Sequence, residues 1–337
     1  MDINKVTSPT SLMEMLRGYQ VSQAIYVAAK LGIADLVKDG PKRSAELAEA
    51  TGTDARSLYR FLRALASRGV FAEDAAGRFG LTPLAELLQT DVPGSMRPVA
   101  IMWCQPWQWQ TWGSLLYSVQ TGETAFRHLY GMSQYEYLAK HPDSNAIFNA
   151  AMVALARARH SVVAAAYNFS GMSRVIDVGG GHGALLAAIL QTNPSLRGIL
   201  FDAPHVVADA KAHFEAAEVA DRCEIVGGDF FASVPEGGDA YILSSVLMDW
   251  DDDRAVAILR NCRRAMVEQG KLLIVEPLIA PGNEASSSKF LDLAMLVVNG
   301  GRLRTEPEFR TLLATANFRM MNTISTQAGR SIIEGVR

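Results

Sequence analysis

The feature that most constrains this chain is a glycine-rich turn between an apolar run and a helical stretch. Residues 175–178 read V-I-D-V, residues 179–183 read G-G-G-H-G, and apolar positions at helical spacing follow over 184–190. Glycine permits the tight turn from a strand into a helix and lets a ligand approach the backbone closely. The segment therefore predicts a strand–turn–helix unit of a nucleotide-binding α/β fold.

The rest of the C-terminal half supports the same fold class. After residue 174, short apolar runs alternate with helical stretches, which is typical of buried parallel strands covered by helices on both faces. The runs lie at 175–178, 199–201, 224–226, 240–243 and 272–275. Two further runs, 318–324 and 331–336, are placed to close the sheet as an antiparallel hairpin. We predict a Rossmann-like domain over 174–337 with a seven-stranded sheet.

The first ninety residues have a different pattern. Apolar positions at helical spacing predict helices at 19–30, 44–50 and 54–67, with Asp54 as an N-cap, and a hairpin around the turn 74–77. This order is that of a winged helix. Arginines 56, 60, 63 and 68 on the third helix suggest DNA binding, but the domain as a whole is not basic, as a DNA reader would be. We assign 1–97 to a winged-helix-like dimerisation domain.

Between these regions lies a helical, aromatic segment at the start of the second predicted domain, 98–337. Four of the five tryptophans fall between Trp103 and Trp112. Such density is typical of a subunit interface or of a pocket wall for a flat ligand, and core packing is an equal alternative. We expect Trp103, Trp107 and Met152 to contact the substrate.

An acidic residue at the end of the second strand narrows the range of possible ligands. Asp202 follows Gly179 by 23 positions (202 − 179) and ends the second strand, where it is placed to accept hydrogen bonds from ribose hydroxyls. The two features together indicate an adenosine-containing ligand. Gly179, Gly181 and Ala184 also satisfy the G-x-G-x-x-A pattern, so a nicotinamide dinucleotide is a rival.

Three details favour S-adenosylmethionine over the dinucleotide. Asp177 stands two residues before the first glycine, as in the D-x-G-x-G-x-G pattern of methyltransferases, where the acid orients the amino-acid end of the cofactor. Asp229 and Phe230 follow the third strand and offer a carboxylate and a ring to adenine. The terminal hairpin is not a feature of dinucleotide folds. We therefore expect S-adenosylmethionine or S-adenosylhomocysteine at these residues.

With these motifs in place, the chain resembles the small-molecule O-methyltransferases of plant and bacterial secondary metabolism over almost its whole length. Within that family it is similar in character to the N-methyltransferase type of phenazine biosynthesis. The resemblance implies a homodimer joined by the N-terminal domains. It also implies cofactor contacts at Gly179, Asp202, Asp229 and Phe230.

The departures from the family concern catalysis. Family members usually read L-H-D-W after the fourth strand, with histidine as the base, whereas residues 247–250 here read L-M-D-W. Met248 thus replaces the base, and Ser244 stands where lysine or arginine is common among cofactor contacts. Glu276 matches the first of two flanking glutamates, and Leu303 replaces the second. The catalytic candidates are Met248, Asp249 and Glu276.

The missing base changes the expected chemistry. A base matters when the acceptor is a phenol of pKa ~10, which is protonated at neutral pH. It matters little for a carboxylate, an acidified phenol, an enolate or a heteroaromatic nitrogen, where proximity and orientation suffice. We therefore predict an O- or N-methyltransferase for an aromatic or polyketide-like metabolite that is already nucleophilic. The alternative is a non-methylating relative, a pericyclase, hydroxylase or decarboxylase.

Other residues complete the predicted acceptor site. Met295 and Asn299 are expected to bind the small-molecule acceptor, with Met102 as a further apolar candidate. Plain core packing is the alternative for these methionines, and it is the favoured one for Met295. His128 and His160 are candidates for a substitute base, although a lone histidine in a helical region is more often structural.

The bulk composition excludes several classes of protein. The formal net charge of -3 gives no general attraction to nucleic acid or acidic membranes. No run approaches the roughly 20 apolar residues of a membrane span, and no signal-peptide pattern is present. The three cysteines are far apart, and no His, Asp or Glu cluster has metal-ligand spacing. We expect a cytoplasmic protein with reduced thiols and no metal, nucleic-acid partner or membrane association.

Overall fold

The computed structural model describes residues 8–327 and 329–337, apart from the side chains of residues 156–159. The chain divides into two compact units, each described here by itself. The first runs up to Gly113 and includes Tyr135–Leu155, and the second consists of Ser114–Gln134 and Ala156–Arg337. No helix among the described residues is both long and apolar enough to cross a membrane.

The first unit joins helices to a small antiparallel sheet. Its elements are α1 (Pro9–Leu16), α2 (Gly18–Leu31), α3 (Ile33–Leu36), β1 (Lys42–Arg43), α4 (Ser44–Thr51), α5 (Ala55–Ala66), β2 (Phe71–Glu73), β3 (Arg78–Leu81), α6 (Pro83–Glu86), α7 (Arg97–Trp103), α8 (Pro106–Gly113) and most of α11 (Gln134–Lys140). The predicted helices and hairpin are confirmed, whereas the two-residue strand β1, which pairs with β3, was not predicted.

Helix α5 shows why this part of the sequence folds as it does. Asp54 caps the helix by accepting a hydrogen bond from the Ser57 N–H at 2.8 Å, as predicted. The apolar stripe of the helix is buried in the core of the unit, at Leu58, Leu62 and Leu65. Its three arginines, at 56, 60 and 63, are exposed, and so is Arg68 just after the helix. The spacing of the leucines therefore fixes which face packs inward.

The second unit contains a seven-stranded sheet in the order β6-β5-β4-β7-β8-β10-β9. The strands are β4 (Arg174–Val178), β5 (Arg197–Asp202), β6 (Cys223–Gly227), β7 (Ala240–Ser244), β8 (Lys271–Glu276), β9 (Arg319–Ser325) and β10 (Ser331–Val336). The first five are parallel, and β10 runs antiparallel to both β8 and β9. All seven predicted strands and the closing hairpin are confirmed.

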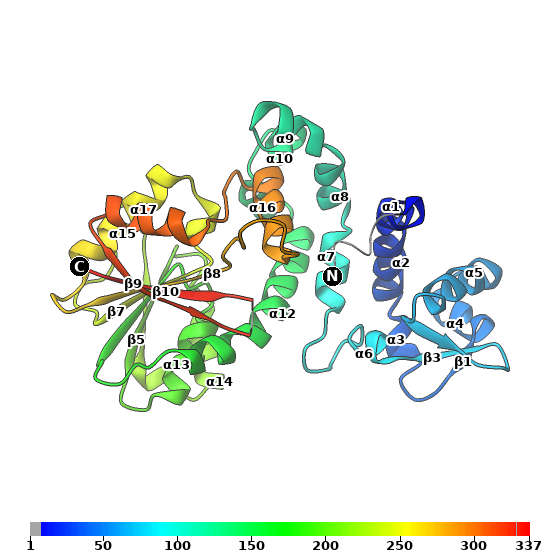
Figure 1. Cartoon of the computed structure of the whole chain (residues 1–337). Coiled ribbons are helices and arrows are strands. Elements are labelled where there is room, and N and C mark those ends of the chain that lie inside the picture. The colour runs from blue at the N-terminus through cyan, green and yellow to red at the C-terminus, as the bar shows by residue number, and fades with distance from the viewer. Residues whose placement is uncertain (1–7, 328) are drawn as a thin grey trace. The chain divides into compact units, whose positions relative to one another are not determined.

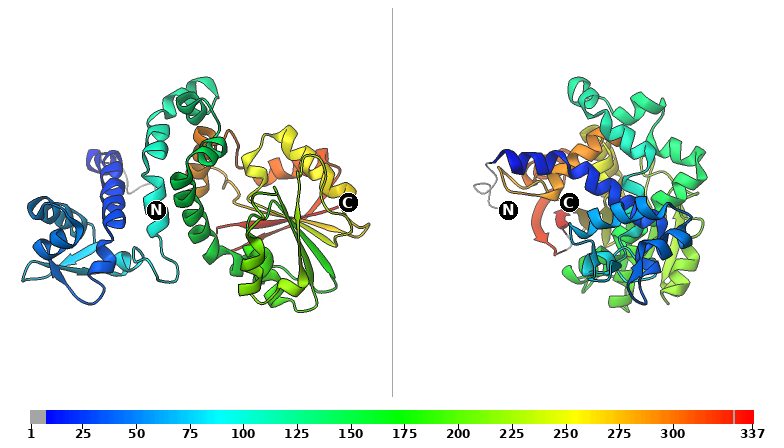
Figure 2. Two further views of the ribbon diagram at one scale, coloured as in Figure 1. Left: turned by 180° about the vertical axis from the view of Figure 1, so that it is seen from behind. Right: turned by 90° about the vertical axis from the view of Figure 1, so that its right-hand side faces the viewer.

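Helices cover both faces of this sheet, as Figure 1 shows, and Figure 2 shows the same layers from behind. One face is covered by the C-terminal part of α12 (Pro142–Ala166), α13 (Ala184–Thr192) and α14 (Ala210–Ala216), and the other by α15 (Asp252–Ala265) and α17 (Glu306–Thr315). The unit also contains α9 (Leu115–Thr121), α10 (Ala125–Tyr130), η2 (Ala220–Arg222), η3 (Leu247–Asp249) and α16 (Ser287–Val298). Ile176 and Val178 pack with α15 and α17, whereas Val175 packs with α12, α13 and α14. The alternating side chains of β4 thus fill two separate cores.

The strand order locates the functional edge of the sheet. The chain passes from β4 to β5 on one side and later returns to β7 on the other side of β4. Ligands of open α/β sheets bind at the carboxyl ends of the strands where the order reverses in this way. The glycine-rich turn follows β4 at that point, so the fold itself favours a ligand site there.

Candidate active site

The glycine-rich turn after β4 has a backbone that only glycine accommodates. Gly179, Gly181 and Gly183 have φ angles of +71°, +60° and +81°, in the left-handed region that other residues rarely adopt. A Cβ on Gly179 would lie 2.7 Å from Cγ2 of Val246, and one on Gly183 would collide with the ring of Phe214. The glycines thus let the backbone of the turn pack closely against Val246 and Phe214 at the predicted cofactor site.

Asp202 lies beside this turn, as the spacing predicted. Its Oδ2 accepts the Gly181 N–H at 2.9 Å, and its Oδ1 accepts the Ala203 N–H at 2.7 Å. A carboxylate has further lone pairs after these two bonds. Asp202 therefore couples the ends of β4 and β5 and keeps capacity to accept hydrogen bonds from a ribose.

Asp177 is the unusual carboxyl group of the site. It is 1% exposed, and neither of its oxygens accepts a hydrogen bond from any described residue. Burial raises its pKa to about 7, and the nearby charge of Asp202 adds to the effect. Most buried polar groups have a partner, so an unsatisfied carboxyl group here suits a ligand that carries a positive charge.

The residues after β6 and β7 complete the predicted cofactor set. Phe230 lies next to the turn, with its Cε1 3.7 Å from where a Cβ of Gly179 would be. Asp229 is exposed, and its Oδ1 accepts the Phe231 N–H at 2.9 Å. Ser244 ends β7 and is half-buried. The glycine cradle, the ring of Phe230 and the unsatisfied Asp177 together fit an adenosine ligand with a cationic amino-acid end.

The catalytic candidates meet at the turn η3. Met248 is buried, and its N–H donates to Oε1 of Glu276 at 2.9 Å. Glu276 ends β8 and is fully buried, and its Oε2 has no partner among the described residues. Burial raises the pKa of Glu276 to about 7, against the lowering effects of the Met248 N–H and Arg304. Glu276 therefore anchors the backbone of the turn that carries Met248.

Asn299 joins the same cluster from the end of α16. Its Nδ2 donates to Oδ1 of Asp249 at 3.3 Å and lies 4.0 Å from the sulfur of Met295. Its Oδ1 is buried without a hydrogen bond in the part of the chain that the structure describes. Met248, Asp249, Glu276, Met295 and Asn299, predicted separately, thus belong to one constellation of the second unit.

Comparison with known proteins gives the family. The O-methyltransferase domain matches residues 112–319, and the O-methyltransferase dimerisation domain matches residues 13–91. This chain belongs to the O-methyltransferase family. As such it is an S-adenosylmethionine-dependent methyltransferase, with a class I methyltransferase domain preceded by a dimerisation domain.

Similar O-methyltransferases act in bacterial secondary metabolism. The chain is 52% identical over 323 residues to the phenazine O-methyltransferase PhzM of Lysobacter antibioticus, covering 96% of this chain and 94% of the relative. The crystal structure of LaPhzM has a TM-score of 0.91 and 51% identity, covering 98% and 99%. NcsB1, an O-methyltransferase from neocarzinostatin biosynthesis, was solved with S-adenosyl-L-homocysteine and 1,4-dihydroxy-2-naphthoic acid. It has a TM-score of 0.78 and 34% identity, covering 94% and 95%.

Three of the predicted substrate-binding residues of this O-methyltransferase lie in its first unit. Trp103 ends α7 and is exposed, Trp107 is buried in α8, and Met152 is half-buried in α12. Their contact with substrate stays a prediction. The two candidate bases, by contrast, lie in the second unit. His128 is exposed near the end of α10, where its ring stacks on Tyr117 with centroids 3.9 Å apart. His160 is half-buried in α12. A role as substitute base stays a prediction for both.

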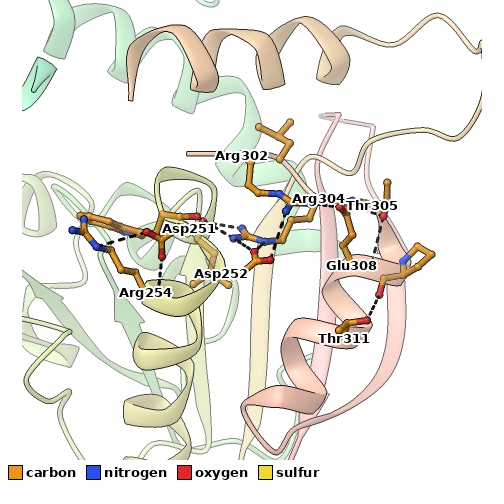
Figure 3. A network of polar contacts seen from close by, with 12 residues as sticks. Asp251, Asp252, Arg254, Arg302, Arg304, Thr305, Glu308 and Thr311 are labelled. Atoms are coloured by element: carbon orange, nitrogen blue, oxygen red, sulfur yellow. Dashed lines mark hydrogen bonds and ion pairs between the residues drawn. The ribbon is translucent and has the colours of Figure 1, made fainter. Parts of the chain in front are cut away.

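Sequence reasoning missed Arg304, the largest fully buried side chain among the described residues. Its guanidinium donates to the carbonyls of Leu247 and Trp250 and to the carboxylate of Asp252. Figure 3 shows Arg304 beside Asp252. The G-G-R-L-R-T motif contains two arginines, and the sequence does not indicate which of them is buried. The first, Arg302, is half-exposed. The partners of Arg304 lie more than fifty positions earlier (304 − 252 = 52).

A cavity of about 540 Å³ lies elsewhere in the second unit. Tyr167, Lys271 and Glu334 line it, at the amino end of β8. Lys271 and Tyr167 both bind Glu334, at 3.1 and 3.2 Å. This cavity is at the opposite edge of the sheet from the glycine-rich turn and contains none of the predicted site residues.

Proposed function

We propose that this O-methyltransferase methylates a planar, fused-ring aromatic metabolite of the phenazine type, at an oxygen that is already acidic. The 52% identity to a phenazine O-methyltransferase over nearly the whole of both chains supports the ring system. The observation that carries the proposal is the buried side chain of Met248, a thioether at the position where the resemblance implies a histidine base. The backbone N–H of Met248 donates to Glu276, which holds this residue in place. A thioether accepts no proton at neutral pH, so the acceptor must lose its proton without this residue.

The proposed cofactor contacts bind different parts of S-adenosylmethionine. The glycine turn and Asp202 hold the adenosine, Asp229 and Phe230 hold adenine, and Asp177 binds the amino-acid end with Ser244 nearby. When bound, S-adenosylmethionine supplies an electrophilic methyl group on positively charged sulfur. Asp177, whose pKa is raised to about 7, loses its proton more readily beside that cationic ligand.

The proposed acceptor contacts supply orientation rather than proton transfer. Met248 and Met295 offer polarisable apolar surface that suits a flat ring. Asp249 and Asn299, joined by a hydrogen bond, offer polar atoms to the acceptor at one place. Positioning of this kind contributes up to about 7–11 kcal/mol in favourable cases. An acceptor oxygen anion oriented by these residues would supply the electron pair for the new bond to the methyl group, with S-adenosylhomocysteine as the leaving group.

A series of substituted hydroxyphenazines of decreasing phenol pKa tests the proposal. At pH 7 we expect the rate to rise as the phenol pKa falls towards 7 and to level off below it, because only the anion reacts. S-adenosylhomocysteine and methylated product should form in equal amounts. A rate that does not depend on the phenol pKa would show that a residue of the protein acts as the base. Product without S-adenosylhomocysteine would favour the non-methylating alternative.

We also propose a homodimer joined through the first unit. The dimerisation domain supports it, and helix α1 buries none of its residues. Leu12, Met15 and Leu16 of α1 are each at least 59% exposed, and Tyr19 continues the exposed apolar surface at 56%. Apolar surface of this kind marks an interaction site. Light scattering of the L12E/L16E variant should give a monomer, and a dimer of unchanged stability would contradict the proposal.

A further inference from the structure

The backbone of the turn that carries Met248 is tied to a short segment after α16. Arg304 Nη1 donates to the Leu247 carbonyl at 2.9 Å, and Arg304 Nη2 donates to the Trp250 carbonyl at 3.0 Å. Between these two bonds, the Arg302 N–H donates to the Met248 carbonyl at 2.9 Å. Three of the four carbonyls in 247–250 thus accept hydrogen bonds from residues 302 and 304.

The guanidinium of Arg304 is held in place by one carboxylate. Its Nε and Nη2 both donate to Oδ1 of Asp252, at 2.9 and 2.7 Å, and its side chain is 1% exposed (Figure 3). Asp252 is the first residue of α15, two positions after Trp250. A planar fork with five donors can serve two carbonyls and a carboxylate at once, which the single ammonium of lysine cannot do in the same geometry.

The same segment is also tied to α16. The Leu303 N–H donates to Oδ1 of Asp292 in α16 at 2.8 Å. Gly301 lies directly against the turn, since a Cβ there would lie within van der Waals radii of the Met248 carbonyl oxygen. Residues 301–304 therefore connect the turn with Met248 to the helix that carries Met295 and leads to Asn299.

We infer that Arg304 is a positioning residue for methyl transfer. It sets the turn of Met248 and Asp249 at a fixed distance from α16, and so sets the width of the acceptor site. The inference rests on the proposed function, which places the acceptor beside Met248 and Asp249. The side chain of Arg302 has a different role, because it pairs with Glu308 and Asp252 on the half-exposed side.

Arg222 offers a matched control for Arg304→Lys. Its guanidinium donates to the carbonyls of Leu190, Asn193 and Leu196, all at the connection of α13 to β5. Arg222→Lys thus removes a similar fork from a place that the proposed site does not use. Both variants are compared at a temperature where circular dichroism shows each to be folded, with single-turnover methyl transfer and calorimetric cofactor binding as the readouts.

For Arg304→Lys we expect the single-turnover rate to fall at least tenfold while the cofactor Kd stays within twofold. For Arg222→Lys we expect the rate to stay within twofold. Equal rates in the two variants would overturn the inference. Should Arg304→Lys fail to fold, Asp252→Asn keeps the guanidinium but removes its charged anchor, and we expect a threefold to fivefold slower rate. A rate equal to wild type in that variant would overturn the inference as well.

Two further variants separate this inference from the proposed function. Met248→Ala and Asp249→Asn alter the acceptor site directly. If neither changes the rate or the acceptor KM, the proposed acceptor site is wrong. If both do and Arg304→Lys behaves like Arg222→Lys, the acceptor site stands and the role of Arg304 is wrong.

Discussion

Asp239 and Asp177 lie at opposite ends of the parallel strands of one sheet, and their surroundings are opposite in kind. Before β7, Asp239 accepts hydrogen bonds from the Ser173 N–H and hydroxyl, each at 2.7 Å, and from the Arg174 N–H at 2.9 Å. Partial burial raises its pKa, but these bonds and the Arg174 charge outweigh it and leave the pKa lowered. In β4, Asp177 is buried with no described partner, and its pKa is raised to about 7.

The difference separates a structural group from a functional one. A satisfied carboxylate joins the starts of β4 and β7, where it stabilises the fold. An unsatisfied one at the carboxyl end of β4 costs stability, because burial disfavours its charge. A protein retains such a cost where a ligand removes it, which supports our proposal that the cofactor binds at the carboxyl end of β4.

The strongest test of the comparison is substitution of Asp177. We expect Asp177→Asn to weaken S-adenosylhomocysteine binding about 100-fold, or about 2.7 kcal/mol, because the amide cannot pair with the ligand ammonium. The free energy of unfolding of the ligand-free protein should not fall. Titration calorimetry and urea unfolding measure the two effects. Unchanged binding would remove Asp177 from the cofactor site.

The same substitution at the other edge should give the reverse result. We expect Asp239→Asn to lower the free energy of unfolding by about 1–3 kcal/mol, because a neutral amide oxygen in place of Oδ2 accepts the same three hydrogen bonds more weakly than the carboxylate does. S-adenosylhomocysteine binding at a temperature where the variant is folded should stay within twofold. A loss of binding equal to that of Asp177→Asn would end the distinction between the two edges.

The two aspartates also predict the pH dependence of stability. A pKa raised in the folded state gives stability that is present below the unfolded pKa of about 4 and is lost as the pH rises through about 7. The pKa of Asp239 is lowered in the folded state, so its contribution to the free energy of unfolding depends on pH in the opposite direction. That contribution is lost only below about pH 4. Between pH 6 and pH 7 the ligand-free protein should lose about 1 kcal/mol through Asp177.

Urea unfolding of wild type and Asp177→Asn at both pH values measures that loss. The variant should lose less stability over this interval, and the remaining slope should come from Glu276, whose pKa is also raised to about 7. Identical slopes in the two proteins would show that Asp177 does not titrate there.

The smallest expected effect concerns Met248. Leucine has a similar volume and no polar atom, and such swaps cost less than about 1.5 kcal/mol in stability. If Met248 is only an apolar wall, Met248→Leu should keep the single-turnover rate within about threefold. A larger loss with unchanged cofactor binding would give the thioether a direct role.

The fold was predictable where local pattern decides structure. The short apolar runs predicted all seven strands, and the glycines at 179, 181 and 183 marked a turn whose φ angles require them. Asp54 predicted a cap because its partner is three residues away. The strand β1 was missed because two residues show no alternation, and only pairing with β3 defines it.

The sequence named candidate site residues, whose roles stay predictions, but it could not show the environment of each side chain. Asp177 followed from its spacing to Gly179, yet its lack of partners depends on strands far away in sequence. Arg304 was missed because its partners, Leu247 and Asp252, come close only in the folded chain. Burial and hydrogen-bond satisfaction are tertiary properties, and they decide which of several similar carboxylates binds a ligand.

Proton release on cofactor binding tests the central claim most directly. Calorimetry of S-adenosylhomocysteine binding at pH 6.5, in two buffers with different ionisation enthalpies, gives the number of protons released. A buried Asp177 that ionises beside the ligand ammonium should release more than half a proton per site, and Asp177→Asn should release less. No release from wild type, or the same release from both proteins, would contradict the account.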